Sequence, residues 1–197
     1  MSGRRIAKPE ALIALAASCW LAPTHAFCAQ DIDEAKAGKV KAAYLFNFAK
    51  FIQWPDKTFK NQESPFVIGV ICSDSFAQTL DKIVRGKKIA DHPVRVRRIH
   101  PNSLEAPSAI NDCQMVYICR SQGDRVNWNL TMSIRRSVLL VSDIKGFASK
   151  GGMIGLALEN GRIVFEINRE NLKRAGLKAS AKLLALARIV KSKERRP

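Results

Sequence analysis

Residues Phe66–Cys72 read FVIGVIC. A continuous apolar run of this length is typical of a strand that is buried on both faces of a sheet. Two further runs of the same kind follow it, Cys113–Cys119 (CQMVYIC) and Ser137–Ser142 (SVLLVS). Three buried strands separated by other elements predict an α/β protein built around one central sheet.

The segments around these runs predict the remaining elements. Apolar residues recur at helical spacing over Val40–Ile52, among them Val40, Tyr44, Leu45, Phe48 and Phe51, and Trp54-Pro55 ends that helix. Ser73-Asp74-Ser75 caps a helix over 76–84. Val94–Ile99 (VRVRRI) alternates like a strand near an edge, and Asp124–Ser133 fits a short helix.

The C-terminal part is predicted to be a hairpin followed by a helix. Met153–Glu159 and Arg162–Asn168 are joined by Asn160-Gly161, the dipeptide that favours a two-residue turn because both positions tolerate positive φ. An apolar stripe of Leu183, Leu186, Ala187 and Val190 predicts a last helix over 177–190. We therefore predict one α/β domain over 40–190, with a mixed sheet, helices on both faces and this hairpin near the C-terminal end.

The N-terminal residues have the three-part layout of a secretory signal peptide. Arg4, Arg5 and Lys8 precede the apolar run ALIALAA (11–17), and Thr24-His25-Ala26 supplies small residues around a cleavage site. The cut could follow Ala26, Cys28 or Ala29, and a lipid attached at Cys19 is an alternative. We predict a signal peptide over 1–29, a disordered segment over 30–39 and a basic tail over 191–197.

The composition is basic, with a net charge of +16 over 197 residues. Removal of residues 1–29 takes three bases and one acid and leaves 30 basic against 16 acidic residues, a net charge of +14. An exported protein does not ordinarily meet nucleic acid, and no aromatic interleaves the basic cluster at 85–98. The charge therefore favours an acidic partner face or a peripheral contact with an anionic membrane.

No catalytic, metal or cofactor motif stands out. The glycines of 146–155 precede a strand, so they do not open a helix as a nucleotide-binding fingerprint would. His92 and His100 lack metal-ligand spacing, and no nucleophile-elbow sequence accompanies the serines. Asp143, at the end of a strand, has the position of a ligand-binding residue in open sheets, although a capping role is simpler. We therefore predict no enzyme, no cofactor and no metal.

Several ordered segments resemble the YfiR-like family of periplasmic proteins. The segments that carry the resemblance are VKAAYLFNFAKFIQWP (40–55), PFVIGVICSDSF (65–76), CQMVYI (113–118), LLVSDIKGFASKGGMIGL (139–156) and NGRIVFEINRENLKRAGLKASAKLLALARIV (160–190). The resemblance implies a periplasmic, non-catalytic regulator that binds the periplasmic sensor region of an inner-membrane diguanylate cyclase and restrains it. Release of the cyclase would raise cyclic di-GMP and favour biofilm formation.

The resemblance also implies stability that depends on disulfides, and a response to redox conditions. Three cysteines remain after the leader, Cys72, Cys113 and Cys119, and which two of them pair stays open. Cys113 stands where family members commonly hold a cysteine. Cys72 and Cys119 each end a buried strand, and they lie within bonding range if those strands are parallel neighbours.

For the partner contact we predict Phe46, Lys50 and Gln53 on the outer face of the first helix, with the Arg95 and Arg97 edge as a second candidate. The alternative function is a small-ligand sensor acting on another membrane receptor or sensor kinase. Its site would lie at the strand ends, near Cys72, Asp143 and the 146–152 loop. A hydrolase and a homodimer are further hypotheses that the sequence leaves open.

Overall fold

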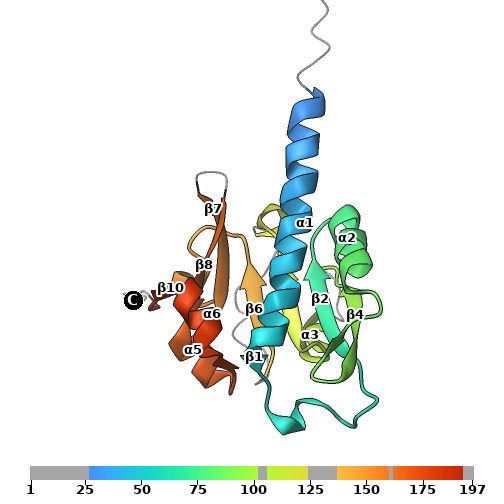
Figure 1. The fold of residues 1–197 in the computed structure, drawn as a ribbon, viewed down its shortest axis with the longest axis vertical. Coiled ribbons are helices and arrows are strands. Elements are labelled where there is room, and N and C mark those ends of the chain that lie inside the picture. The colour runs from blue at the N-terminus through green and yellow to red at the C-terminus, as the bar shows by residue number, and fades with distance from the viewer. Residues whose placement is uncertain (1–26, 102–105, 124–136, 160–161, 193–197) are drawn as a thin grey trace, which may run out of the picture.

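The computed structural model describes residues 27–101, 106–123, 137–159 and 162–192 (Figure 1). The helices are α1 (Phe27–Phe51), α2 (Asp74–Val84), α3 (Ala106–Asn111), α5 (Arg169–Arg174) and α6 (Ala181–Leu186), with 3-10 turns η1 (Asp56–Thr58), η2 (Arg120–Gln122) and η3 (Ala148–Lys150). The strands are β1 (Ile52–Gln53), β2 (Phe66–Ile71), β3 (Lys88–Ile89), β4 (His92–Arg98), β5 (Met115–Ile118), β6 (Leu139–Ser142), β7 (Ile154–Glu159), β8 (Arg162–Asn168), β9 (Lys178–Ala179) and β10 (Arg188–Val190).

Strand β2 occupies the interior of the main sheet, whose order is β10-β8-β7-β6-β5-β2-β4-β3. It pairs in parallel with β4 on one side and with β5 on the other, so that Ile68 lies between Val96 and Met115. The β7–β8 and β3–β4 pairs are antiparallel, whereas β5–β6, β6–β7 and β8–β10 are parallel. The predicted mixed sheet is therefore confirmed.

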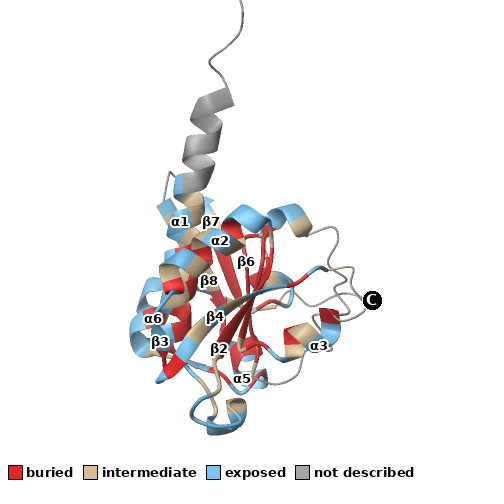
Figure 2. Cartoon of the chain, turned by 90° about the vertical axis from the view of Figure 1, so that its right-hand side faces the viewer, coloured by how far each residue is buried: buried red, intermediate tan, exposed pale blue. Residues whose placement is uncertain are grey.

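Apolar side chains pack on both faces of this sheet. One face carries Ile68, Val70 and Tyr117 under α1, α2 and the C-terminal helices, and the other carries Ile71 and Val116 under α3. Figure 2 shows the buried strands enclosed by helices whose outer faces are exposed. The prediction of helices on both faces of one α/β domain is confirmed.

Helix α1 crosses one face of the sheet, and its N-terminal turns extend beyond it (Figure 1). Leu45, Phe48 and Ala49 are buried in the core, and Phe48 meets Phe165 of β8 edge-on, with 5.1 Å between ring centroids. The predicted apolar stripe is shifted, because Val40 is 45% exposed and Ala42 is fully buried. The helix thus joins the C-terminal half of the sheet to β2.

Residues 30–39 differ from the predicted disordered segment, because α1 begins at Phe27 and includes them. Alanine and lysine, which have high intrinsic helix propensity, alternate over Ala35–Ala37 and continue into the packed part of the helix. The side chains before Lys36 lie outside the described residues, as do the signal peptide up to residue 26 and residues 193–197 of the basic tail.

The hairpin is confirmed, and the last helix is not. Strands β7 and β8 pair with Glu159 opposite Arg162, while the predicted turn residues Asn160 and Gly161 and the predicted helix at 124–133 lie outside the described residues. The prediction of one helix over 177–190 is wrong. Ala187 is extended, and Arg188–Val190 forms β10 because the open edge of β8 offers backbone hydrogen bonds.

We predict that Phe48→Ala lowers the free energy of unfolding by about 3–5 kcal/mol, because the ring is 1% exposed and its removal leaves a cavity. Urea unfolding followed by circular dichroism measures the change. Asn47→Ala, an exposed neighbour on the same helix, is the matched control and is expected to stay within about 0.5 kcal/mol. A loss below about 1 kcal/mol for Phe48→Ala would show that α1 does not anchor the core.

Candidate functional site

The carboxyl ends of β2, β5 and β6 meet at one edge of the sheet and border a cavity of about 790 Å³. The chain leaves β2 towards β4 on one side and leaves β5 towards β6 on the other, so a crevice opens between the two strand ends. Open α/β sheets bind ligands at such a point. The residues that border the cavity are Ala37, Gly38, Lys39, Lys41, Cys72, Ser73, Ser75, Phe76, Thr79, Tyr117, Cys119, Arg120, Ser121, Asp143, Leu156, Ala157, Leu158 and Ile163.

Asp143 is the centre of the polar contacts at this edge. Its carboxylate accepts one hydrogen bond from Lys41 Nζ at 2.6 Å and another from the Arg120 backbone amide at 2.6 Å. Burial, followed by the charge of Asp143, raises the pKa of Tyr117 above its usual range. Asp143 therefore ties α1 to the ends of β5 and β6.

Cys72 and Cys119 lie side by side on this edge. They directly follow β2 and β5, whose parallel register places Ile71 opposite Ile118, and both border the cavity on the α1 side of the sheet. A hydrogen bond from the Cys72 thiol and a second from Ser121 lower the pKa of Cys119 to about 6. The same hydrogen bond raises the pKa of Cys72, because Cys72 retains the shared proton.

Cys113 is separated from this pair by the sheet. It packs on the α3 face, 2% exposed, and its Sγ donates to the Ala109 carbonyl oxygen at 3.1 Å. A Cβ atom at Gly69 of β2 would lie 2.9 Å from that Sγ, so glycine is needed there for close packing. Burial raises the pKa of Cys113 to about 11. Of the three candidate cysteines, the structure brings together only Cys72 and Cys119.

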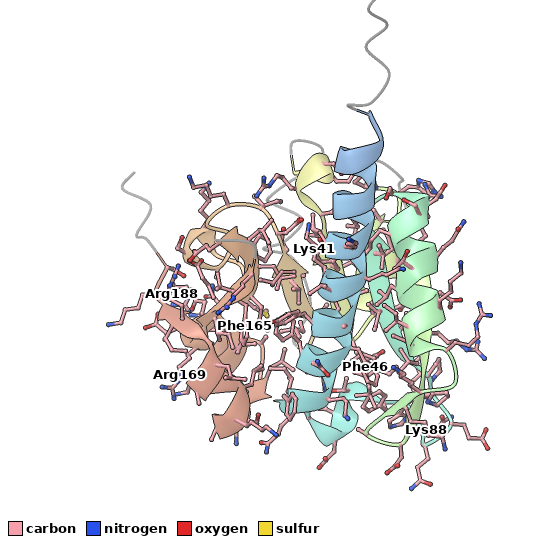
Figure 3. All side chains as sticks on the ribbon, turned by 45° about the horizontal axis from the view of Figure 1, so that its top comes forward. Lys41, Phe46, Lys88, Phe165, Arg169 and Arg188 are labelled. Carbon is pink, nitrogen blue, oxygen red and sulfur yellow. The ribbon has the colours of Figure 1, made fainter. Side chains whose placement is uncertain are left out.

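The outer face of α1 carries the predicted contact residues Phe46, Lys50 and Gln53. Phe46 is half-buried, and two ammonium groups lie over its ring: Lys87 Nζ at 4.7 Å from the centroid and Lys50 Nζ at 5.7 Å. Figure 3 shows Phe46 on the flank of α1 that faces β3, and Lys41 nearer the opposite end of the helix. We call Phe46, Lys50, Gln53 and Lys87 the α1 patch.

Arg95 and Arg97 lie on the opposite face of the sheet from the α1 patch. They pair in register with Val67 and Gly69 of β2, whereas the alternating residues Val94 and Val96 face α1. Both arginines are exposed, and Arg97 Nη1 lies 3.3 Å from a carboxylate oxygen of Asp112. The two predicted contact surfaces are therefore not contiguous.

Sequence reasoning placed Cys72 and Asp143 at the strand ends but missed Lys41, Tyr117 and Lys87. Tyr117 has a recognisable signal, since it lies in β5 two residues before Cys119, and the extended backbone puts both side chains on the same side. Lys41 and Lys87 have none, because a lysine in a helix and one in a turn are ordinary surface residues until the packing is known.

Within the described ranges, no group of three or more His, Cys, Asp or Glu side chains is placed to hold a metal ion. The helices of the same ranges include none that is long and apolar enough to cross a membrane.

Comparison with known proteins identifies one family. A family model described as YfiR/HmsC-like matches residues 38–188, from the cavity end of α1 to the start of β10. The chain belongs to the YfiR/HmsC-like family. A comparison with curated proteins gave no match. The matched region contains the cavity, the Cys72–Cys119 pair, the α1 patch and the Arg95 and Arg97 edge.

We predict that Cys119 is the most reactive of the three thiols in the reduced protein. Its alkylation by iodoacetamide, followed residue by residue by mass spectrometry, is expected to rise with pH around a midpoint near its pKa of about 6, because the thiolate is the nucleophile. Cys72→Ala removes the donor and is expected to move this midpoint upward. Cys113 is the internal control and is expected to stay unreactive below its pKa of about 11. A Cys119 midpoint that does not move in Cys72→Ala would contradict the hydrogen-bonded pair.

Proposed function

We propose that this protein is a periplasmic, non-catalytic regulator that binds the periplasmic sensor region of an inner-membrane diguanylate cyclase and holds the enzyme inactive. The observation that carries the proposal is the YfiR/HmsC-like match over 38–188. The basic charge of the chain supports it, since a positive surface favours association with an acidic partner face. Lower cyclic di-GMP and less biofilm would follow from the restraint.

The restraint requires differential affinity. A regulator shifts a two-state receptor only by the ratio of its affinities for the two states, so this protein would bind the inactive sensor domain more tightly than the active one. A tenfold difference in affinity corresponds to about 1.4 kcal/mol, and a switch from mostly active to mostly inactive requires several times that.

The α1 patch is the contact surface that we favour. Lys50 and Lys87 lie over the Phe46 ring and form no ion pair within the described residues, so their charges are available to a partner. Aromatic rings are enriched at the centres of interfaces, and lysines at the rim guide an acidic partner onto them. The Arg95 and Arg97 edge is the second candidate. Arg97 is already paired with Asp112, and a partner that covered the α1 patch would not reach this edge without passing round β4.

We predict that the double reversal Lys50→Glu with Lys87→Glu weakens binding to the sensor domain by about tenfold or more, mainly through a slower association rate. Lys173→Glu is the matched control, because it reverses an exposed lysine on α5 outside the patch. Binding of the mature protein to purified sensor domain by surface plasmon resonance measures both variants.

The same variants test the function in cells. Deletion of the gene is expected to raise cyclic di-GMP, and the wild type and Lys173→Glu, but not the patch reversal, should restore the low level. The patch is the wrong surface if its reversal restores the wild-type level, and Arg95→Glu with Arg97→Glu then tests the second edge. The proposed function itself fails if deletion leaves cyclic di-GMP unchanged and no diguanylate cyclase is recovered with the tagged protein from membranes.

We extend the proposal to the thiols: in an oxidising compartment Cys72 and Cys119 join, and Cys113 stays reduced. Neighbouring positions on paired strands have the Cα spacing that a disulfide needs. We expect non-reducing digestion of the protein from the periplasm to give one linked Cys72–Cys119 peptide, which links β2 to β5. A linked peptide that contains Cys113 would overturn this assignment. A pull-down of the cyclase with and without reductant then tests whether the bond affects binding.

The second candidate function is a small-ligand sensor that acts on a membrane receptor or sensor kinase. The cavity at the carboxyl edge favours it, since it lies where open sheets bind ligands and has the volume of a small-molecule site. The two functions are compatible, because a regulator of a cyclase can itself bind a signal.

A further inference from the structure

We infer that the cavity at the carboxyl ends of β2, β5 and β6 binds a small organic anion that carries an apolar group, such as a medium-chain carboxylate. The inference deepens the ligand-sensor candidate and rests on it, while it is independent of which membrane protein the chain contacts. Three features of the cavity carry it: its unbalanced positive charge, its apolar wall and its position at the divergence of two chain connections.

The charge around the cavity is positive after its internal pairs are removed. Lys41 and Asp143 neutralise each other at 2.6 Å, and the second Asp143 oxygen is occupied by the Arg120 backbone amide. Two exposed cations remain at the border, Lys39 and the Arg120 guanidinium, and neither has a side-chain partner within the described residues. An anionic ligand would therefore find unpaired positive charge, whereas a cation would find that Asp143, the only carboxylate among the described residues at the border, is already engaged.

The start of α2 adds to this preference. Ser73 and Ser75 border the cavity, and the amides of a first helical turn point outward without intrahelical partners. The Phe76 amide is capped by Ser73 Oγ at 3.4 Å. The carboxylate of this turn, Asp74, is paired with Arg98, which limits its repulsion of an anion.

The cavity also has apolar borders. The β7–β8 hairpin contributes Leu156, Leu158 and Ile163, and α2 contributes Phe76. Leu158 is 63% exposed. A large aliphatic side chain left in solvent beside a cavity gains free energy when a ligand covers it. Small-molecule sites combine such apolar surface with a few placed charges, and their volumes span the roughly 300–1,000 Å³ range that includes this cavity. An anion without an apolar group would leave that wall uncovered.

The experiment compares three probes on the reduced mature protein by isothermal titration calorimetry at fixed salt. Octanoate carries both features, octanamide lacks the charge, and acetate lacks the chain. We expect octanoate to bind at least about tenfold more tightly than either of the others, the loss that corresponds to one removed interaction of about 1.4 kcal/mol. Equal affinity for octanoate and octanamide would overturn the inference.

Variants assign the binding to the cavity. Arg120→Gln and Leu158→Asp are each expected to weaken octanoate binding by about tenfold, whereas Lys173→Glu should leave it within about twofold. Circular dichroism confirms that each variant is folded. Arg120→Gln keeps the backbone amide at position 120, which donates a hydrogen bond to the Asp143 carboxylate, so the local fold is not disturbed. Unchanged affinity in both cavity variants would place the binding elsewhere and overturn the inference.

Protection of the thiols gives a second readout. Cys119 borders the cavity, so bound octanoate is expected to slow its alkylation by several-fold, while Cys113 on the other face of the sheet is not affected. Octanoate that binds without slowing the Cys119 reaction would also overturn the assignment. None of these variants lies in the α1 patch, so failure of the inference and failure of cyclase binding are distinguished.

Discussion

Strand β2 has paired neighbours on both edges and buried side chains on both faces, and this position determines where the neighbouring strands and their ends lie. Its parallel register with β4 places Arg95 and Arg97 on one face and Val94 and Val96 on the other. Its register with β5 brings Cys72 and Cys119 together at the carboxyl edge. The same two strands send the chain in opposite directions, which opens the cavity between their ends. One buried strand therefore fixes the cysteine pair, the cavity and the β4 edge.

The contacts of α1 extend this arrangement across the sheet. Its buried side packs Phe48 against Phe165, and its Lys41 reaches the carboxylate of Asp143 more than a hundred residues away in the chain. Removal of the half-buried Lys41 or of the buried Asp143 would leave the other charge without compensation, so this pair sets the position of the helix more than it contributes net stability. The helix is consequently held at both ends of its packed portion.

The strands and the hairpin could be predicted from local sequence, whereas the cavity and the last segment could not. FVIGVIC is a continuous apolar run of strand length, and the flanks of Asn160-Gly161 surround a dipeptide that favours a hairpin turn. The segment 177–190 is ambiguous, since its leucines fit a helical stripe, and the pairing of Arg188–Val190 with β8 decides against that reading. Strand pairing is not visible in a single sequence. For the same reason the sequence leaves open which two of the three cysteines pair, and only the faces of the sheet separate Cys113 from the other two.

Helix α1 contributes to both proposed binding surfaces. Ala37, Gly38, Lys39 and Lys41 border the cavity, and Phe46 and Lys50, about one and a half and two and a half turns beyond Lys41, form part of the α1 patch. A ligand beside Lys39 and Lys41 would change the electrostatic environment of the Lys41–Asp143 pair, which ties this helix to the sheet. A displacement of the helix at that pair would reach Phe46 together with Ala42 and Leu45, the fully buried core residues that lie between Lys41 and Phe46. The fold thus offers a direct physical route from an occupied cavity to a partner-binding face.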